Sequence, residues 1–323
     1  MLLVHNRHIP CGEQLRADNN FSLERILLEM RGRAGKVLIM ILLTGVTGHT
    51  GCRLADHLAA RGGRVRAMTR SPGKIPAGLR GRIEVFQGDL ENAGQAADAA
   101  RGCSAVLALT HIRFAPLVIG AAQTAGVSRA VFMSSTRRYT KYPEATARQV
   151  MAGEEAVRSS GLEWTIIRPS MIYGGRQDNN IEHLVRSLRR FPVHPLPGGG
   201  RMLWQPVFVW DVVAAIEAAL DDPASIRNEY TIAGPQPISY ACMVRTILRV
   251  MNRRVLLVPI PMAGLKSVAW LSGWISGRPR ITMEQIRRLE EDKVFDISPA
   301  AHDLHFQPTP FEAGIRRKLA DDV

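Results

Sequence analysis

A turn with three glycines follows an apolar run, and it limits the possible folds of this chain more than any other feature. The segment LLTGVTGHTG places Gly45, Gly48 and Gly51 between the apolar run 36–45 and the amphipathic stretch 51–62. Glycines at a strand-to-helix turn let the backbone approach a pyrophosphate, whose charge then lies on the helix N-terminus. Three side chains in the same turn could donate hydrogen bonds to phosphate: Thr47, His49 and Thr50.

Short apolar runs recur beyond this turn, and amphipathic stretches separate most of them. The strand-like runs lie at 36–45, 64–71, 82–90, 104–109, 129–135 and 163–170. Strands separated by helices of this length form βαβ units, whose parallel sheet is covered on both faces. Right-handed crossovers then predict a doubly wound α/β fold of the Rossmann type, with an NAD(P)-binding domain over residues 37–170.

The alternation becomes irregular after residue 170. Residues 205–222 are typical of a strand followed by a helix, and residues 228–251 of a strand, a turn and a helix. We expect residues 171–323 to form a smaller lobe on the substrate side, interleaved with the sheet. Residues 1–36 lack the apolar core and cleavage site of a signal peptide, so we expect an N-terminal extension without a role in function.

Charge and composition narrow the classes of function. Lys and Arg number 42 against 29 Asp and Glu, but they are scattered, with the densest clusters at 186–190 and 252–254. A basic surface attracts nucleic acid, anionic lipid or phosphate groups, and the scatter favours a phosphate-bearing cofactor over nucleic acid. The four cysteines are far apart and the histidines have no ligand spacing, so we expect no metal and a reducing cytoplasm.

The end of the second strand indicates which dinucleotide binds. In NAD-specific folds an Asp or Glu about 20 residues beyond the loop bonds the ribose hydroxyls. Thr69 and Arg70 take that place here. An arginine suits a 2′-phosphate and Lys74 could assist, which favours NADP over NAD, unless Arg70 is only a solvated loop residue. After the third strand, Asp89 could accept from adenine with Leu90 against the ring, or could simply cap a turn.

With these features the chain resembles the extended or atypical short-chain dehydrogenases/reductases. TGVTGHTG is similar to that family's TGATGxxG loop, and GDL, FMSS and WTIIRPSMIYG fit its later strands. The resemblance covers nearly all of residues 38–318. It leans toward the NmrA-like and complex I accessory-subunit branches, with the NAD-dependent epimerase/dehydratase proteins as relatives.

The resemblance implies roles for individual residues along the cofactor. Gly45 to Gly51 would hold the pyrophosphate, Arg70 the 2′-phosphate, and Asp89 with Leu90 the adenine. Leu109, Thr110 and Ser134 would line the ribose and nicotinamide. Pro169 and Ser170 would lie near the nicotinamide amide.

The catalytic pair of that family is missing from its usual place. The family uses a Tyr as acid/base and a Lys four residues later, so that both lie on one helical face. Its Lys lies four residues before a helix Glu. Counting back from Glu154 places Val150 at the Lys position and Thr146 at the Tyr position. Neither residue can do this chemistry, and no lysine follows Tyr139 or Tyr142 at the required spacing.

Two hypotheses for function remain. In the first, the protein is an NADPH-dependent oxidoreductase acting on an unknown small molecule. A group on the loop would then act on a carbonyl or activated double bond, or binding and polarisation alone would suffice. The candidates are Ser135, Tyr139, Lys141 and Tyr142. In the second, the protein is a non-catalytic NADP(H)-binding regulator or assembly factor that acts through a protein or membrane partner, and the loop is a solvated basic turn.

The C-terminal half adds two candidate contact segments. Residues 176–180, RQDNN, are polar enough to contact a substrate, or could form a capping loop. Residues 262–277 are apolar and contain Trp270 and Trp274. They could line a lipid- or quinone-sized pocket or lie on a membrane surface, but packing in the core is favoured.

Overall fold

The computed structural model describes residues 39–175, 178, 180–264 and 291–321. Residues Leu38–Val323 cluster into one compact unit. The expected N-terminal extension lies outside the described residues. So do most of RQDNN and both tryptophans of the 262–277 segment.

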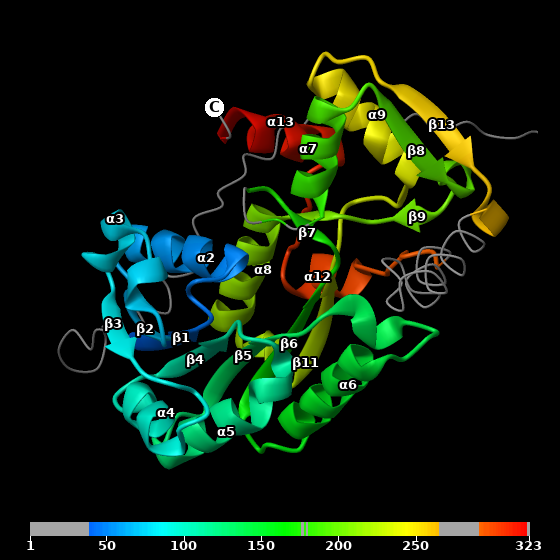
Figure 1. Cartoon of the computed structure of the whole chain (residues 1–323). Coiled ribbons are helices and arrows are strands. Elements are labelled where there is room, and N and C mark those ends of the chain that lie inside the picture. The colour runs from blue at the N-terminus through cyan, green and yellow to red at the C-terminus, as the bar shows by residue number, and fades with distance from the viewer. Residues whose placement is uncertain (1–38, 176–177, 179, 265–290, 322–323) are drawn as a thin grey trace, which may run out of the picture. The chain divides into compact units, whose positions relative to one another are not determined.

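A seven-stranded parallel sheet forms the centre of this unit (Figure 1). Its strands, in chain order, are β1 (Met40–Thr44), β2 (Arg64–Thr69), β3 (Glu84–Gln87), β4 (Ala105–Ala108), β5 (Arg129–Met133), β6 (Glu163–Pro169) and β11 (Asn228–Ile232). Their spatial order is β11-β6-β5-β4-β1-β2-β3, and every neighbouring pair is parallel. This order extends the Rossmann order by one strand and confirms the predicted doubly wound fold.

Helices cover both faces of the sheet because successive strand residues point to opposite sides. On β1, Ile41 and Leu43 pack in the core cluster that contains helices α2 and α8. Met40 and Leu42 pack in a second cluster with α4, α5 and α6. The bounds of these helices are α2 (His49–Ala60), α4 (Ala93–Ala100), α5 (Ala115–Thr124), α6 (Ala145–Arg158) and α8 (Val209–Asp221). A single helical turn, α3 (Ala77–Arg80), precedes β3.

Elements after residue 170 build a third core cluster. They are α7 (Ile181–Arg190), β8 (Val193–Pro197), α9 (Tyr240–Val250), β13 (Leu256–Ile260) and α13 (Phe311–Asp321). Short strands join this part in pairs: β7 (Ile172–Tyr173) with β10 (Val207–Phe208), and β9 (Leu203–Trp204) with β12 (Ile238–Ser239).

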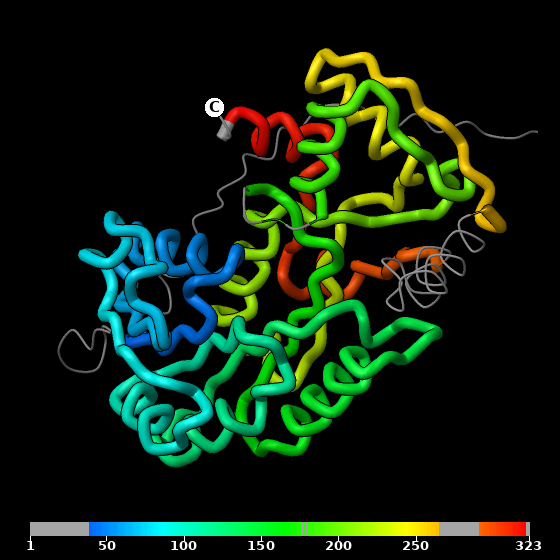
Figure 2. Tube along the Cα trace, viewed as in Figure 1, coloured from blue at the N-terminus to red at the C-terminus, as the bar shows by residue number. Residues whose placement is uncertain are grey.

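The same half of the chain also contributes to the central sheet. The trace in Figure 2 returns to that sheet through α8 and β11, and α12 (Ser298–Asp303) packs beside β11. The division at residue 170 stays a prediction. Among the described residues, no helix is long and apolar enough to cross a membrane, and no group of three His, Cys, Asp or Glu could hold a metal ion.

Candidate functional site

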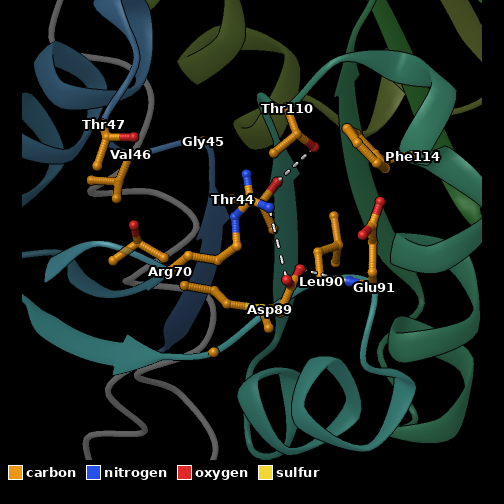
Figure 3. A pocket seen from close by; sticks show the side chains of 13 residues that line it. Thr44, Gly45, Val46, Thr47, Arg70, Asp89, Leu90, Glu91, Thr110 and Phe114 are labelled. Carbon is orange, nitrogen blue, oxygen red and sulfur yellow. Dashed lines mark hydrogen bonds and ion pairs between the residues drawn. The ribbon is translucent and has the colours of Figure 1, made fainter.

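A pocket of about 160 Å³ lies at the carboxyl ends of β1, β2, β3 and β4 (Figure 3). Its lining consists of residues 44–47, 68–70 and 88–91 together with Thr110 and Phe114. The strand order reverses between β1 and β4, which makes this edge the topological switch point of the sheet. Open α/β sheets bind their ligands in the crevice at that point.

The glycine turn forms one wall of the pocket, and its geometry requires glycine. Gly45 has a φ of +79°, and a Cβ there would lie 2.8 Å from the carbonyl carbon of Leu109. A Cβ on Gly51 would lie 2.2 Å from the carbonyl oxygen of Gly45. Helix α2 begins at His49 with Gly48 as its N-cap, without a side-chain cap or an acidic residue in its first turn. Its first amides can therefore donate hydrogen bonds to a pyrophosphate.

The side chains of the glycine turn separate into two groups. Thr47 lines the pocket, whereas His49 and Thr50 are not among its lining residues. Both ring nitrogens of His49 are buried without a hydrogen-bond partner among the described residues. Burial, and then the charges of Arg53 and Lys318, lower the pKa of His49 to about 4, so the ring is neutral at pH 7. The role of His49 and Thr50 at the phosphate stays a prediction.

Three of the four residues predicted to contact the 2′-phosphate and adenine line the pocket. Arg70 and Asp89 both line it, and Arg70 Nη1 is 3.8 Å from Asp89 Oδ2 (Figure 3). The Arg70 side chain is 73% exposed. Asp89 also accepts a hydrogen bond from the amide of Glu91, so it forms the turn that the sequence left as an alternative. Leu90 lines the pocket, and Lys74 is exposed outside the lining.

The residues assigned to the nicotinamide half do not all meet in this pocket. Thr110 lines it, with its Oγ1 3.4 Å from Thr44 Oγ1, and Leu109 is buried just behind it. Ser134, Pro169 and Ser170 are not in its lining. The hydroxyl of Ser134 donates to Glu154 at 2.6 Å, and that of Ser170 donates to the carbonyl of Gln205 at 2.5 Å. Their contact with nicotinamide stays a prediction.

The four candidate catalytic residues lie on the loop after β5, outside the pocket lining. Ser135 accepts from the amide of Arg137 and so caps the short helix η3 (Thr136–Tyr139). The backbone amide of Lys141 donates to Glu291 at 2.6 Å. The side chain of Tyr142 is exposed.

Tyr139 has the most contacts of the four. Its hydroxyl accepts from Arg168 at 3.2 Å and lies 2.9 Å from Thr231 Oγ1. Its ring packs beside Phe295, with ring centroids 5.9 Å apart. Partners from β6, β11 and the segment near residue 295 therefore hold this tyrosine at the carboxyl end of the sheet.

Glu154, from which the positions of the Tyr–Lys pair were counted, lies in a buried ionic cluster under the loop. Glu154 is fully buried and accepts from Arg168 Nε at 2.6 Å and from Arg168 Nη2 at 2.8 Å. Arg158 and Arg138 each approach it at 3.1 Å, and Glu229 pairs with both Arg158 and Arg168. Burial acts to lower the pKa of Arg168, but hydrogen bonds to Glu154 and Glu229 raise it above its usual value.

The two positions where the family carries its Lys and Tyr, Val150 and Thr146, both lie on helix α6. Val150 is buried in the core cluster that also contains Ile112 and Phe132, and Thr146 is only partly buried. Neither position carries an ionisable side chain, so the chemistry of a Tyr–Lys pair is absent from this face of α6.

Known proteins resemble this chain both in sequence and in fold. Residues 45–190 match a family model described as NAD(P)H-binding. The chain is 30% identical over 220 residues to (4-alkanoyl-5-oxo-2,5-dihydrofuran-3-yl)methyl phosphate reductase of Streptomyces griseus, an alignment that covers 66% of this chain and 74% of that protein. The chain belongs to the atypical short-chain dehydrogenases/reductases. Its glycine turn is therefore part of an NAD(P)H-binding domain.

One further sequence relative and one solved structure also resemble this chain. The chain is 31% identical over 194 residues to NADH dehydrogenase (ubiquinone) 1 alpha subcomplex subunit 9 of Mus musculus. That alignment covers 59% of this chain and 51% of the mouse protein, so the chain spans about half the length of this relative. UDP-glucuronic acid 4-epimerase from Bacillus cereus, solved in complex with NAD, has the same fold with a TM-score of 0.70 at 15% identity. That match covers 87% of this chain and 98% of the epimerase.

Several residues at the site were not found from the sequence. Glu91 and Phe114 line the pocket, although no motif marks them. Thr44 also lines it; it opens the TGVTGHTG motif, but no role of its own was predicted for it from the sequence. Arg168 and Glu229 complete the buried ionic cluster. A charged residue inside the apolar strand EWTIIRPS was a usable signal for that cluster, because a buried arginine needs a carboxylate partner.

Proposed function

We propose that this protein is an NADPH-dependent reductase that delivers hydride to a small molecule without a Tyr–Lys acid/base pair. The observation that carries the proposal is the pocket at the switch point. Its glycine turn leaves no room for a Cβ at Gly45 or Gly51, and a guanidinium lies at its adenosine end. The reductase named among the relatives supports the reaction class.

The preference for NADPH rests on Arg70. Its guanidinium is mostly exposed and is only loosely paired with Asp89, so it is available to a 2′-phosphate. The residue at the end of β2 is Thr69, whose hydroxyl accepts from the amide of Ser71. No carboxylate from the end of β2 is present to bind the ribose hydroxyls of NAD.

The chemistry that remains for the chain is binding and orientation. When bound, the cofactor supplies the hydride. The amides of the glycine turn would hold the pyrophosphate, and Arg70 would hold the 2′-phosphate. Thr110 would line the ribose and nicotinamide. Because Thr146 and Val150 cannot supply a proton, the substrate we propose is a double bond conjugated to a carbonyl. Hydride addition there forms a delocalised anion, which can take its proton from water.

Cofactor preference is tested by titrating the purified protein with NADPH and with NADH. We expect tighter binding of NADPH. Arg70→Ala should weaken NADPH binding by roughly 10- to 100-fold, since hydrogen bonds to charged groups contribute about 1.5–3 kcal/mol, and should leave NADH binding unchanged. Arg64→Ala, at the other end of β2 and also exposed, is the matched control. Equal affinities for the two cofactors in the parent and in Arg70→Ala would contradict the proposal.

The reaction is tested by NADPH oxidation across conjugated carbonyls, quinones and simple ketones. We expect turnover of a conjugated carbonyl, with less than about threefold change in Tyr139→Phe and Tyr142→Phe. A positioned acid usually contributes 10²- to 10⁴-fold, roughly. A loss of that size in either variant would show that a tyrosine of the loop donates the proton. The proposal that water protonates the anion would then be wrong.

One observation favours a second candidate, a non-catalytic NADP(H)-binding protein with a protein partner. The hydroxyls of Tyr139 and Ser134 at the carboxyl ends of the strands are already held by Arg168, Thr231 and Glu154. The mouse relative is by name a subunit of a larger assembly. Tight NADPH binding without turnover on any substrate of the panel would favour this candidate. For either candidate we propose a reducing compartment such as the cytoplasm, because the cysteines of the described residues are free thiols.

A further inference from the structure

The two-stranded parallel sheet of β8 and β13 has one buried face and one exposed face. Val193 pairs with Leu256, and Pro195 pairs with Val258. The alternate residues His194 and Leu196 are buried, and Leu196 packs in the core cluster with α7 and α9. Because side chains alternate along a strand, the paired residues lie together on the opposite face. Figure 1 shows these two strands side by side, apart from β2 and β3 of the central sheet.

The exposed face is apolar. Leu256 is 64% exposed, and Val193 and Val258 are also exposed, with Pro195 between them. Phe191 adjoins the same end of the sheet and is 50% exposed. The backbone fixes this end, since the amide of Leu256 donates to the carbonyl of Pro192 at 2.8 Å. Large apolar side chains gathered on a surface usually mark an interaction site.

A pair of arginines lies shortly before the start of each strand. Arg189 and Arg190 precede β8, and Arg253 and Arg254 precede β13. The parallel pairing places the two arginine pairs at the same end of the sheet, although about 60 residues separate them in the chain. The two densest basic clusters of the sequence therefore precede the same end of this two-stranded sheet.

Nothing acidic along these segments offsets this charge. The sequence has no Asp or Glu between Glu182 and Asp211, and none between Glu229 and Glu284. All four arginines are exposed, and within the described part of the chain no acidic partner is seen for any of them. The guanidinium of Arg190 lies over the ring of Phe191, 5.5 Å from its centroid, so charge and apolar surface are directly joined.

We propose that this surface docks on an anionic lipid bilayer. We call it the β8–β13 face, and it consists of Phe191, Val193, Pro195, Leu256 and Val258 with Arg189, Arg190, Arg253 and Arg254. Apolar side chains beside a basic rim match the boundary between acyl chains and anionic headgroups. Arginine stems can extend along apolar surface while their charged ends reach the headgroups. A bilayer needs no shape complementarity, whereas a specific protein partner needs roughly 800 Å² of matched surface.

The test is flotation of the full chain with vesicles. We expect binding to vesicles of equal parts phosphatidylcholine and phosphatidylglycerol, and none to phosphatidylcholine alone. Binding should weaken between about 0.1 M and 1 M salt, because the screening length falls from roughly 10 Å to 3 Å. Arg190→Glu/Arg254→Glu should lower the vesicle partition coefficient at least about tenfold, since each basic residue near an anionic surface contributes roughly fivefold to it.

Two further variants test whether the position of the charge matters and whether the apolar side chains contribute. Arg64→Glu/Arg101→Glu makes the same change in net charge at the amino-terminal edge of the central sheet, and should change vesicle binding less than about twofold, since only charges within a screening length of the bilayer contribute. Leu256→Ser should weaken vesicle binding without any change of charge. Each variant should keep the parent's circular dichroism and NADPH affinity, so failure here is distinct from failure of the proposed function.

The proposal is overturned in any of three ways. The parent chain could fail to bind anionic vesicles at low salt. The Arg190→Glu/Arg254→Glu variant could bind as well as the Arg64→Glu/Arg101→Glu variant. A soluble acidic protein could bind the β8–β13 face while anionic vesicles do not, and a protein partner would then replace the membrane.

Discussion

The buried ionic cluster yields the sharpest prediction about what holds this fold together. Glu154 on α6 joins the helix to strand β6 through two hydrogen bonds from Arg168, at 2.6 and 2.8 Å. It also accepts from the hydroxyl of Ser134 at the end of β5. Glu154→Gln keeps the size of the side chain but removes its charge. It also replaces one acceptor oxygen with a donor that faces an arginine.

The magnitude follows from the charges that are left behind. Glu154 and Glu229 are approached by three arginines, Arg138, Arg158 and Arg168. The substitution leaves one carboxylate among three guanidinium groups, and Arg168 is only 4% exposed. Removing one partner of a buried pair typically costs about 3–5 kcal/mol. For a unit of this size that loss corresponds to a fall in Tm of roughly 6–20 °C.

Denaturant unfolding followed by circular dichroism measures this loss directly. Glu155→Gln is the matched control, because it makes the same chemical change one residue later on the same helix. The Glu155 side chain is 70% exposed and lies 3.3 Å from Arg158. Exposed pairs contribute about 0–1 kcal/mol, so this control should stay close to the parent. A loss below about 1 kcal/mol in Glu154→Gln would refute the role assigned to the cluster.

Two other predictions concern stability against pH and the glycine turn. Burial, and then the nearby Glu217, raise the pKa of Asp221 from 3.8 to about 6. The folded state thus prefers the protonated carboxyl, and the resulting destabilisation is absent below pH 3.8 and complete above pH 6. Asp221→Asn should then raise the free energy of unfolding by up to about 3 kcal/mol at pH 7.5 and by almost nothing at pH 3.8; an equal gain at both pH values would contradict this. Gly45→Ala should lower stability by about 1–3 kcal/mol and weaken NADPH binding, whereas Gly62→Ala, at φ +80° with no neighbour within 4 Å, should affect stability alone.

The central sheet could be predicted because its evidence is local. Each of the first six strands lies in a short apolar run, and the glycine turn identifies the first βα connection. The pairing of β11 with β6 could not be read in the same way. It joins residues about 60 positions apart, and nothing within NEYTI shows which edge of the sheet it will extend. The two-stranded sheet of β8 and β13 depends likewise on long-range pairing.

In the candidate site, too, residues next to predicted strands could be found from the sequence, and residues placed by long-range packing could not. The first residues of the glycine turn and the ends of β2 and β3 line the pocket because they follow strands that the sequence reveals. Thr47, Arg70, Asp89 and Leu90 are examples. Phe114 was missed because it lies on the short helix η2 (Ile112–Phe114), whose approach to the pocket depends on how the chain turns after β4.

The loop after β5 shows most clearly what local patterns leave open. Counting from Glu154 places Thr146 and Val150 on the helix because helical periodicity is local. The position of Tyr139 depends instead on Thr231 and Phe295, which lie more than 90 residues away in the sequence. For Tyr139 to protonate a substrate, its hydroxyl would have to give up its hydrogen bond to Thr231 and form one to that substrate. Tyr139→Phe therefore distinguishes the two cases: loss of turnover with intact NADPH binding means that the exchange occurs, whereas loss of stability alone means that Tyr139 only secures the loop.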